Sequence, residues 1–284
     1  MNSATNNTIP FDYCVNKAIP DGSNLYYATL FEEEKNKAII IGLHAFLYEL
    51  TDIIQECSDP GIARVKLHWW QEEIERLFQQ QPRHPITRYL KEFITLDENI
   101  RKSFNSIINN FDKFLFIDQT ENLATILALY NSTAGEIWDL CGVQLGVSNT
   151  LSLQNYRALG SVCHYLRCLQ EPNTYITDSR CIIPENIIKQ GDLLNMKFEA
   201  QKHSINQATI FSPLIRELKI LLEESYDGLH KNDSSALKHG LVLNRLALKT
   251  CDEILNDGCK LLSINTSLTP LRKLWISWWI HFIS

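Results

Sequence analysis

Three carboxylates at helical spacing are the residues of this chain best suited to chemistry. Glu49, Asp52 and Glu56 stand at i, i+3 and i+7 within the segment 35–57. On an α-helix this spacing places all three on one face, less than two turns apart. A few carboxylates suffice to hold Mg²⁺, which completes its octahedron with water and substrate phosphate oxygens. The same stripe is typical of the solvated face of an amphipathic helix, so spacing alone leaves both interpretations open.

Other residue types that carry chemistry are present without the partners they need. Four histidines stand singly among apolar neighbours, as is typical of core or boundary positions: His44, His68, His164 and His281. No cysteine pair has the spacing of zinc ligands, and the eight cysteines are predicted to be reduced core residues of a cytoplasmic protein. HExxH pairs, glycine-rich phosphate loops and the GxSxG motif are absent. These residues by themselves identify no catalytic group.

The composition indicates a globular protein made of helices. The 11 glycines and 9 prolines together make up about 7% of the 284 residues, whereas their usual combined share is roughly 12%. This composition favours long helices over the many tight turns of a sandwich or barrel. Hydrophobic residues make up 45% of the chain, enough for a sizeable core. The net charge of −6 removes the basic surface that nucleic-acid-binding proteins carry, so nucleic acid is not an expected partner.

Apolar residues at three- and four-residue steps predict a series of helices with short connections. The predicted helices span residues 35–57, 61–81, 86–94, 97–117, 120–146, 152–171, 184–190, 193–208, 211–230, 233–256 and 268–283. In the second of these, Ile62, Val65, Trp69, Ile74 and Leu77 are predicted to face inward and Glu72, Glu73, Glu75 and Arg76 outward. We therefore expect one all-α domain over residues 12–284, preceded by a polar tail over residues 1–11.

The apolar segments predict no membrane-spanning helix. The N-terminal residues are polar, without the pattern of a secretory signal, and no window of 18 uncharged apolar residues occurs. The tryptophan-rich stretch 274–283 is too short to span a bilayer and is predicted to be either a core helix or an interfacial anchor. The expected location is the cytoplasm, with a peripheral position at the inner face of a membrane, contacted through the C-terminal helix, as the alternative.

Five segments, in this order and at compatible spacings, resemble the squalene/phytoene synthase family: Ser23–Phe31, Lys35–Phe46, Leu129–Glu136, Leu159–Pro184 and Leu271–Trp279. The resemblance covers about residues 12–284 and implies the isoprenoid-synthase fold, a helical bundle around an apolar central cavity. Active members are transferases of isoprenoid biosynthesis that join two prenyl diphosphates head to head. Two DxxxD motifs on facing helices hold the Mg²⁺ ions that neutralise the diphosphates.

The resemblance also assigns roles to positions of this chain. Substrate-binding positions fall on Tyr26, Tyr27, Lys37, Asn131, Arg167 and Gln170, with Lys37 and Gln170 standing where active members have arginine. The two aspartate positions of the first motif hold Thr51 and Gln55, and Asp52 and Glu56 stand one residue later. A shift of one residue turns a helical side chain by about 100°. The first and fifth positions of the second motif hold Glu171 and Tyr175.

This loss of aspartates resembles a degenerate branch of the family, that of the mitochondrial complex I assembly factor with a phytoene-synthase fold. The likeness is close across Ala45–Trp70. It implies a weakly catalytic or non-catalytic protein without a cofactor, which binds a prenyl chain or lipid in an assembly-factor-like role. The alternative is an active Mg²⁺-dependent prenyltransferase that makes a squalene- or phytoene-type product from prenyl diphosphates. In that case Asp52, Glu56 and Glu171 are the expected metal ligands.

Overall fold

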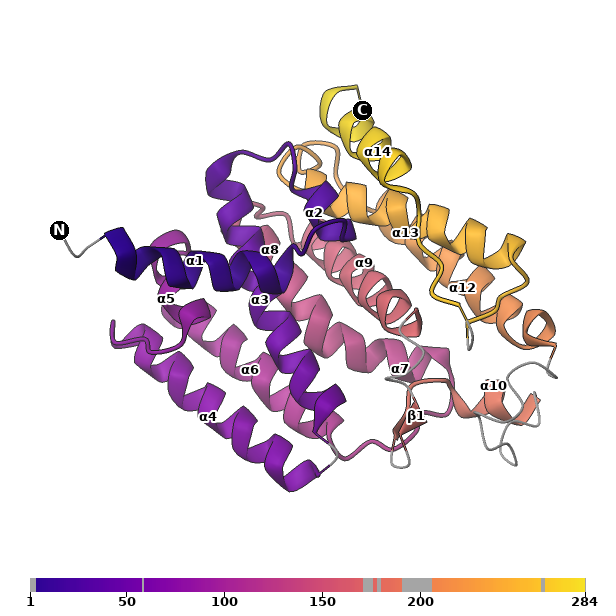
Figure 1. The fold of residues 1–284 in the computed structure, drawn as a ribbon, viewed down its shortest axis with the longest axis horizontal. Helices are drawn as coiled ribbons and strands as arrows, with labels where there is room; N and C mark the ends of the chain where they lie inside the picture. Colours follow the sequence, from indigo (N-terminus) through magenta and orange to yellow (C-terminus); the bar gives the residue numbers. More distant parts are fainter. Residues whose placement is uncertain are drawn as a thin grey trace.

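The computed structural model describes residues 4–57, 59–170, 176–177, 180–190, 206–261 and 264–283, and these form the helical bundle of Figure 1. Its helices are α1 (Ala4–Ala18), α2 (Asn24–Ala28), α3 (Glu34–Glu56), α4 (Pro60–Phe78), α5 (Pro85–Phe93), α6 (Glu98–Phe114), α7 (Leu123–Tyr130), the π-helical turn η1 (Asn131–Gly135), α8 (Glu136–Gln144), α9 (Thr150–Leu169), α10 (Glu185–Gln190), α12 (Gln207–Asp227), α13 (Lys238–Asn256) and α14 (Pro270–Phe282). Two short strands, β1 (Ile176–Thr177) and β2 (Arg180–Cys181), pair antiparallel. The prediction of an all-α fold is confirmed.

Helix α3 runs through the middle of the bundle. Every residue from Ala38 to Leu47 is buried, because α1, α4, α5, α6 and α8 all contact this helix. A helix that is apolar on all sides needs such a complete cover. By length and composition α3 could also cross a membrane, but 72% of its apolar window is buried inside the bundle. This burial agrees with the role of a core helix.

Helix α9 lines a pocket inside the bundle together with α3. It packs against η1 and α8 on one side and against α12 and α13 on the other. The sequence predicts one continuous helix over residues 120–146, and the structure has an uninterrupted helical run over residues 123–144, in which the π-helical turn η1 joins α7 to α8. At η1 the backbone comes so close to α9 that a Cβ atom on Gly135 would lie 2.8 Å from the carbonyl oxygen of Arg157.

Helix α4 is rotated relative to the prediction. Ile62, Val65 and Trp69 were expected to face inward, yet they are 58%, 70% and 40% exposed. The buried face instead carries an uninterrupted stripe at helical spacing: Ala63, Leu67, Trp70, Ile74 and Leu77. The apolar residues of α4 cover two faces of the helix, and only contact with α3, α5 and α6 selects between them.

The same rotation buries Glu73, which was predicted to face solvent. Its carboxylate accepts hydrogen bonds from the backbone N–H groups of Arg83, at 2.6 Å, and His84, at 2.8 Å, and from the hydroxyl of Thr87. It also pairs with Arg76 at 2.7 Å. Burial by itself would raise the pKa of Glu73, but these hydrogen bonds outweigh it and hold the pKa below its usual value. Glu73 thereby fixes the chain that leads into α5, whose first N–H groups lack helical partners.

Two helices precede the first predicted one. Helix α1 begins at Ala4, inside the region assigned to a polar tail, and packs on α3 and α5. Helix α2 begins after Ser23, whose hydroxyl accepts a hydrogen bond from the N–H of Tyr26 at 3.1 Å and so caps the helix. The predicted helix over residues 193–208 lies largely outside the described residues. The polar composition of α1 and the shortness of α2 hide both helices from a periodicity analysis.

Candidate functional site

A pocket of about 410 Å³ lies between α3 and α9, with α1, α2 and α13 completing its wall. Leu47, Trp138 and Leu166 are at most 3% exposed and form its deep, apolar part. The side chains of Lys17 and Asp52, which are 24% and 34% exposed, lie nearer to solvent. The pocket thus combines an apolar interior with a polar entrance, as is usual for sites that bind small molecules.

Thr51 and Gln55 contact α9 beside this pocket. The hydroxyl oxygen of Thr51 lies 3.3 Å from Nε2 of His164, and the amide of Gln55 lies 3.8 Å from the sulfur of Cys168. Thr51 donates its own hydrogen to the carbonyl of Leu47 at 2.8 Å. The hydroxyl has only one hydrogen to give, so His164 must donate from Nε2 to Thr51. Neutral groups therefore connect the two helices at this point.

The carboxylates of α3 point in another direction, toward α1. The ammonium of Lys17 contacts Asp52 directly and lies 3.2 Å from Glu49. The hydroxyl of Tyr13 donates to Glu49 at 2.5 Å. Burial of Lys17 opposes its charge, yet its bonds to the two carboxylates raise its pKa above the usual value. Glu56, the third carboxylate of the stripe, is exposed at the end of α3.

The described residues do not fit a metal site. They contain no group of three or more histidine, cysteine, aspartate or glutamate side chains that could hold an ion together. Asp52 and Glu49 already share an ammonium, and the groups that face α9 are a hydroxyl and an amide. Mg²⁺ requires hard, anionic oxygen ligands in an octahedron. Glu171 and Tyr175 lie outside the described residues.

Two buried histidines, His44 and His164, line the pocket, and a third, His239, lies beside His44. The His44 ring lies 5.9 Å from that of Trp138 and 6.3 Å from that of His239. Burial lowers the pKa of His44 to about 4 and holds those of His164 and His239 well below the usual value. All three are therefore neutral at pH 7.

His44 offers the pocket a hydrogen-bond acceptor. Its Nδ1 lies 3.0 Å from the carbonyl of Ile40, which can only accept, so the proton of the neutral ring is on Nδ1. Nε2 then carries a lone pair, and it is buried without a hydrogen-bond partner among the described residues. Because His44 lines the pocket, a ligand hydroxyl could reach an otherwise unused acceptor.

Two of the substrate-binding positions inferred from the resemblance line the pocket as well. The guanidinium carbon of Arg167 lies 4.5 Å from the centre of the Tyr48 ring, a cation–π contact. The amide of Gln170 donates to the carbonyl of Thr266, in the loop that precedes α14. The structure thus brings Arg167 and Gln170 together with Asp52.

The other predicted positions lie elsewhere in the fold. Tyr26 and Tyr27, on α2, stack edge to face at 5.2 Å and do not line the pocket. Lys37 lies at the start of α3, about two turns before His44. Asn131 accepts hydrogen bonds from Nε of Arg157, at 2.9 Å to its side chain and 3.0 Å to its carbonyl.

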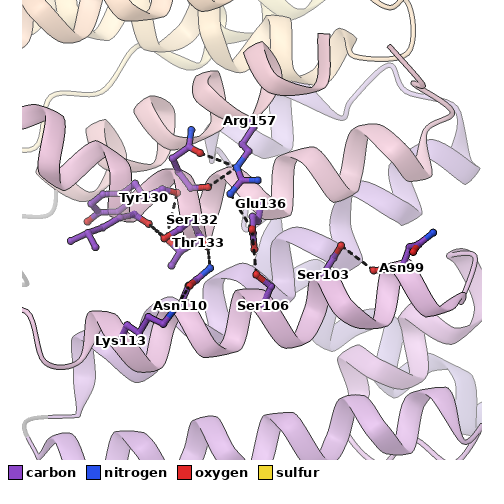
Figure 2. Close-up of polar contacts among 12 residues, drawn as sticks. Asn99, Ser103, Ser106, Asn110, Lys113, Tyr130, Ser132, Thr133, Glu136 and Arg157 are labelled. Atoms are coloured by element: carbon purple, nitrogen blue, oxygen red, sulfur yellow. Dashed lines mark hydrogen bonds and ion pairs between the residues drawn. The ribbon is translucent and has the colours of Figure 1, made fainter. Parts of the chain in front are cut away.

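Figure 2 shows that Arg157 fastens η1 to the neighbouring helices. Besides Asn131, it pairs with Glu136 at 3.0 Å, and Glu136 accepts from Ser106 of α6 at 3.4 Å. Asn110 of α6 donates to the carbonyl of Ser132 at 2.9 Å. Asn131 therefore belongs to a polar layer that holds the π-helical turn between α6 and α9.

Two residues of the pocket, Tyr48 and Lys17, are not among the predicted positions. Tyr48 shares a face of α3 with His44, Thr51 and Gln55, which stand at i, i+7 and i+11 with Tyr48 at i+4, and this spacing was a usable signal. Lys17 carried no such signal, because α1 was not predicted to be a helix.

The chain is similar to known proteins over most of its length. The family model of squalene/phytoene synthases matches residues 20–273. The crystal structure of squalene synthase HpnC from Alicyclobacillus acidocaldarius is similar at 15% identity and a TM-score of 0.67, covering 90% of this chain and 96% of that one. A dehydrosqualene synthase crystallised with a ligand is similar at 13% identity and a TM-score of 0.71, covering 97% and 96%. No curated protein sequence matches the chain significantly.

Proposed function

The chain belongs to the squalene/phytoene synthase family, and we propose that it is a non-catalytic member that holds a prenyl chain or another lipid in its central pocket. The observation that supports this most directly is the arrangement of α3. Thr51 and Gln55 lie toward α9, whereas Asp52 is turned toward Lys17. The carboxylates that would have to hold Mg²⁺ between the helices are thus occupied by an ammonium.

Loss of the metal ligands removes the means of ionising a prenyl diphosphate. The leaving diphosphate has to be neutralised while an apolar pocket shelters the carbocation. Where Thr51 and Gln55 contact α9, the described side chains supply a hydroxyl, an amide, an imidazole and a thiol, and Asp52, which lines the pocket, is paired with Lys17. Binding of an apolar chain does not require these missing charges.

The residues that remain favour a ligand with a long apolar part and one polar end. Leu47, Trp138 and Leu166 would surround the apolar chain. Nε2 of His44 would accept a hydrogen bond from a terminal hydroxyl, and Arg167 lines the same pocket. We propose that the loaded protein acts through a protein partner, in an assembly-factor-like role, because the sequence resembles that branch across Ala45–Trp70.

A turnover assay tests the proposal. Purified protein is incubated with labelled farnesyl and geranylgeranyl diphosphate and Mg²⁺, with and without NADPH, and the products are identified by mass spectrometry. We expect no condensation product, and native mass spectrometry of the same preparation should show a retained isoprenoid or lipid. A squalene- or phytoene-type product that disappears with EDTA would contradict the proposal. If this activity also disappeared in the Asp52→Ala/Glu56→Ala variant, those carboxylates would be metal ligands of an active prenyltransferase.

A further inference from the structure

Helix α14 presents a wide apolar face to solvent. It lies at the edge of the bundle, where it contacts α2 and α13, and it ends close to the C-terminus of the chain (Figure 1). Seven large apolar residues, each between 37% and 80% exposed, form what we call the α14 face: Leu271, Leu274, Trp275, Trp278, Trp279, Phe282 and Ile283. Exposed apolar patches of this extent mark interaction surfaces rather than ordinary protein surface.

The opposite side of α14 is fastened to the bundle by polar contacts. The buried hydroxyl of Ser277 donates to the carbonyl of Tyr27 at 2.6 Å. The ammonium of Lys273 donates to the carbonyl of Gly22 at 2.9 Å. Since these bonds set the rotation of the helix, the α14 face is held outward. At one end of the face, the ring of Phe282 packs edge to face on that of Phe31 at 5.3 Å, while the three tryptophans stay 37–59% exposed.

Tryptophan chemistry indicates what kind of surface would cover this face. The rings of Trp275 and Trp278 lie 5.2 Å apart, and those of Trp275 and Trp279 lie 6.0 Å apart, so three indoles form one cluster. An indole has a large apolar body and an N–H that needs a polar partner. The boundary between lipid headgroups and acyl chains supplies both, and tryptophan is enriched there.

A cation beside the face, unpaired among the described residues, favours an anionic bilayer. Residues 264–283 include no aspartate or glutamate, and their two long cationic side chains are already engaged, Arg272 with Glu253 at 2.5 Å and the buried Lys273 with the carbonyl of Gly22. A groove of about 900 Å³ continues the face between α14, α13 and α12. Arg245 lines this groove, is exposed and has no ion pair with a described residue. The acidic residues of the groove, Glu223 and Asp227, lie on its α12 side.

We propose that the α14 face docks on an anionic phospholipid bilayer. The helix lies parallel to the membrane plane, with its three indoles at the level of the headgroups and Arg245 near the lipid phosphates. Amphipathic helices with tryptophan, phenylalanine and leucine on the lipid side bind membranes in this way. The inference is independent of the proposed lipid ligand, because the α14 face and the central pocket share no residue.

Vesicle binding of the full-length chain tests the docking. Wild-type protein is sedimented with phosphatidylcholine vesicles and with vesicles that also contain phosphatidylglycerol. We expect binding to the mixed vesicles and, in the Trp275→Ser/Trp278→Ser/Trp279→Ser variant, a loss of partition coefficient on the order of tenfold or more. The control is Ile62→Ser/Val65→Ser, which removes two apolar side chains of α4 that are 58% and 70% exposed and should bind like wild type.

A second measurement keeps the test valid if the triple variant does not fold. The measurement uses Trp69→Phe protein, in which the two tryptophans outside α14, Trp70 and Trp138, are only 3% exposed. Quenching of its tryptophan fluorescence by lipids brominated near the headgroup would therefore report on the tryptophans of α14, and we expect such quenching. Absence of quenching, or equal vesicle binding by the folded triple variant, would overturn the proposal. The proposal would also be overturned if wild-type protein bound neither kind of vesicle and formed a dimer that the triple variant cannot form. The α14 face would then bind a second copy of the chain.

Discussion

Thr51 and His164, 113 residues apart in sequence, contact each other directly where α3 meets α9, with 3.3 Å between the hydroxyl oxygen and Nε2. The resemblance to squalene/phytoene synthases places a metal-binding aspartate at position 51. In this chain the same place holds a hydroxyl that accepts a hydrogen bond from a neutral imidazole. This pair offers no anionic oxygen to a metal ion, and it supports the proposal that the protein holds an apolar ligand.

Introducing a carboxylate at position 51 should destabilise the fold. Thr51 is 5% exposed, so the Thr51→Asp variant would bury a charge beside groups that do not neutralise it. We expect the free energy of unfolding to fall by about 2–4 kcal/mol. Thr51→Val, which loses only the hydroxyl bonds, should cost about 1 kcal/mol. Urea unfolding measures the free energy of unfolding of both variants. A Thr51→Asp variant as stable as wild type would show that the contact between α3 and α9 at His164 accepts a negative charge.

Glu73 should contribute strongly to stability although it does not line the pocket. In Glu73→Ala the N–H groups of Arg83 and His84 and the hydroxyl of Thr87 lose their common acceptor inside the protein. We expect a loss of about 3 kcal/mol, measured by urea unfolding. The neighbouring Glu72 is half exposed, and Glu72→Ala should change stability by less than about 1 kcal/mol. Equal losses in the two variants would contradict the role given to Glu73.

Stability should fall in mildly acidic solution because of the buried histidines. Burial lowers the pKa of His44 from 6.5 to about 4, so the unfolded chain binds a proton at pH 5 that the folded chain does not. The free energy of unfolding therefore decreases as the pH falls from about 6.5 to about 4, with His44 contributing a loss of about 3 kcal/mol.

Urea unfolding between pH 7 and pH 4 measures this dependence. The His44→Gln variant should show a smaller pH slope than wild type, because it no longer titrates. The control is His68→Gln, at a side chain that is 71% exposed, which should leave the slope unchanged. If the His44→Gln variant kept the pH slope of the wild type, a group other than His44 would be responsible for the pH dependence of stability.

Narrowing the pocket should displace the proposed ligand. Ala247 lines the pocket and is 7% exposed, so the ring of Ala247→Phe would occupy part of its volume of about 410 Å³. We expect native mass spectrometry to show less retained lipid than in wild type. Ala124→Phe, at an exposed position of α7, is the matched control and should retain the wild-type amount. Unchanged retention in Ala247→Phe would locate the lipid outside this pocket.

Local sequence patterns determined the fold class, the family and most of the helices. Apolar periodicity located α3 and α9 to within a few residues, since a helix that packs against others must repeat its apolar residues every three or four positions. Ordered family segments added the isoprenoid-synthase fold, which the family match and the solved structures confirm. The degenerate branch and the roles of the assigned site residues remain predictions.

Tertiary structure decided the rest, because the missing information lies in contacts between distant segments. Helix α4 carries apolar residues on two faces, and only its neighbours determined that Glu73 is buried while Val65 is exposed. The carboxylates of α3 look like a metal site in the sequence, yet Lys17 of an unpredicted helix neutralises Asp52. Sequence spacing fixes which side chains share a face of one helix, whereas their charge environment depends on which helix packs against that face.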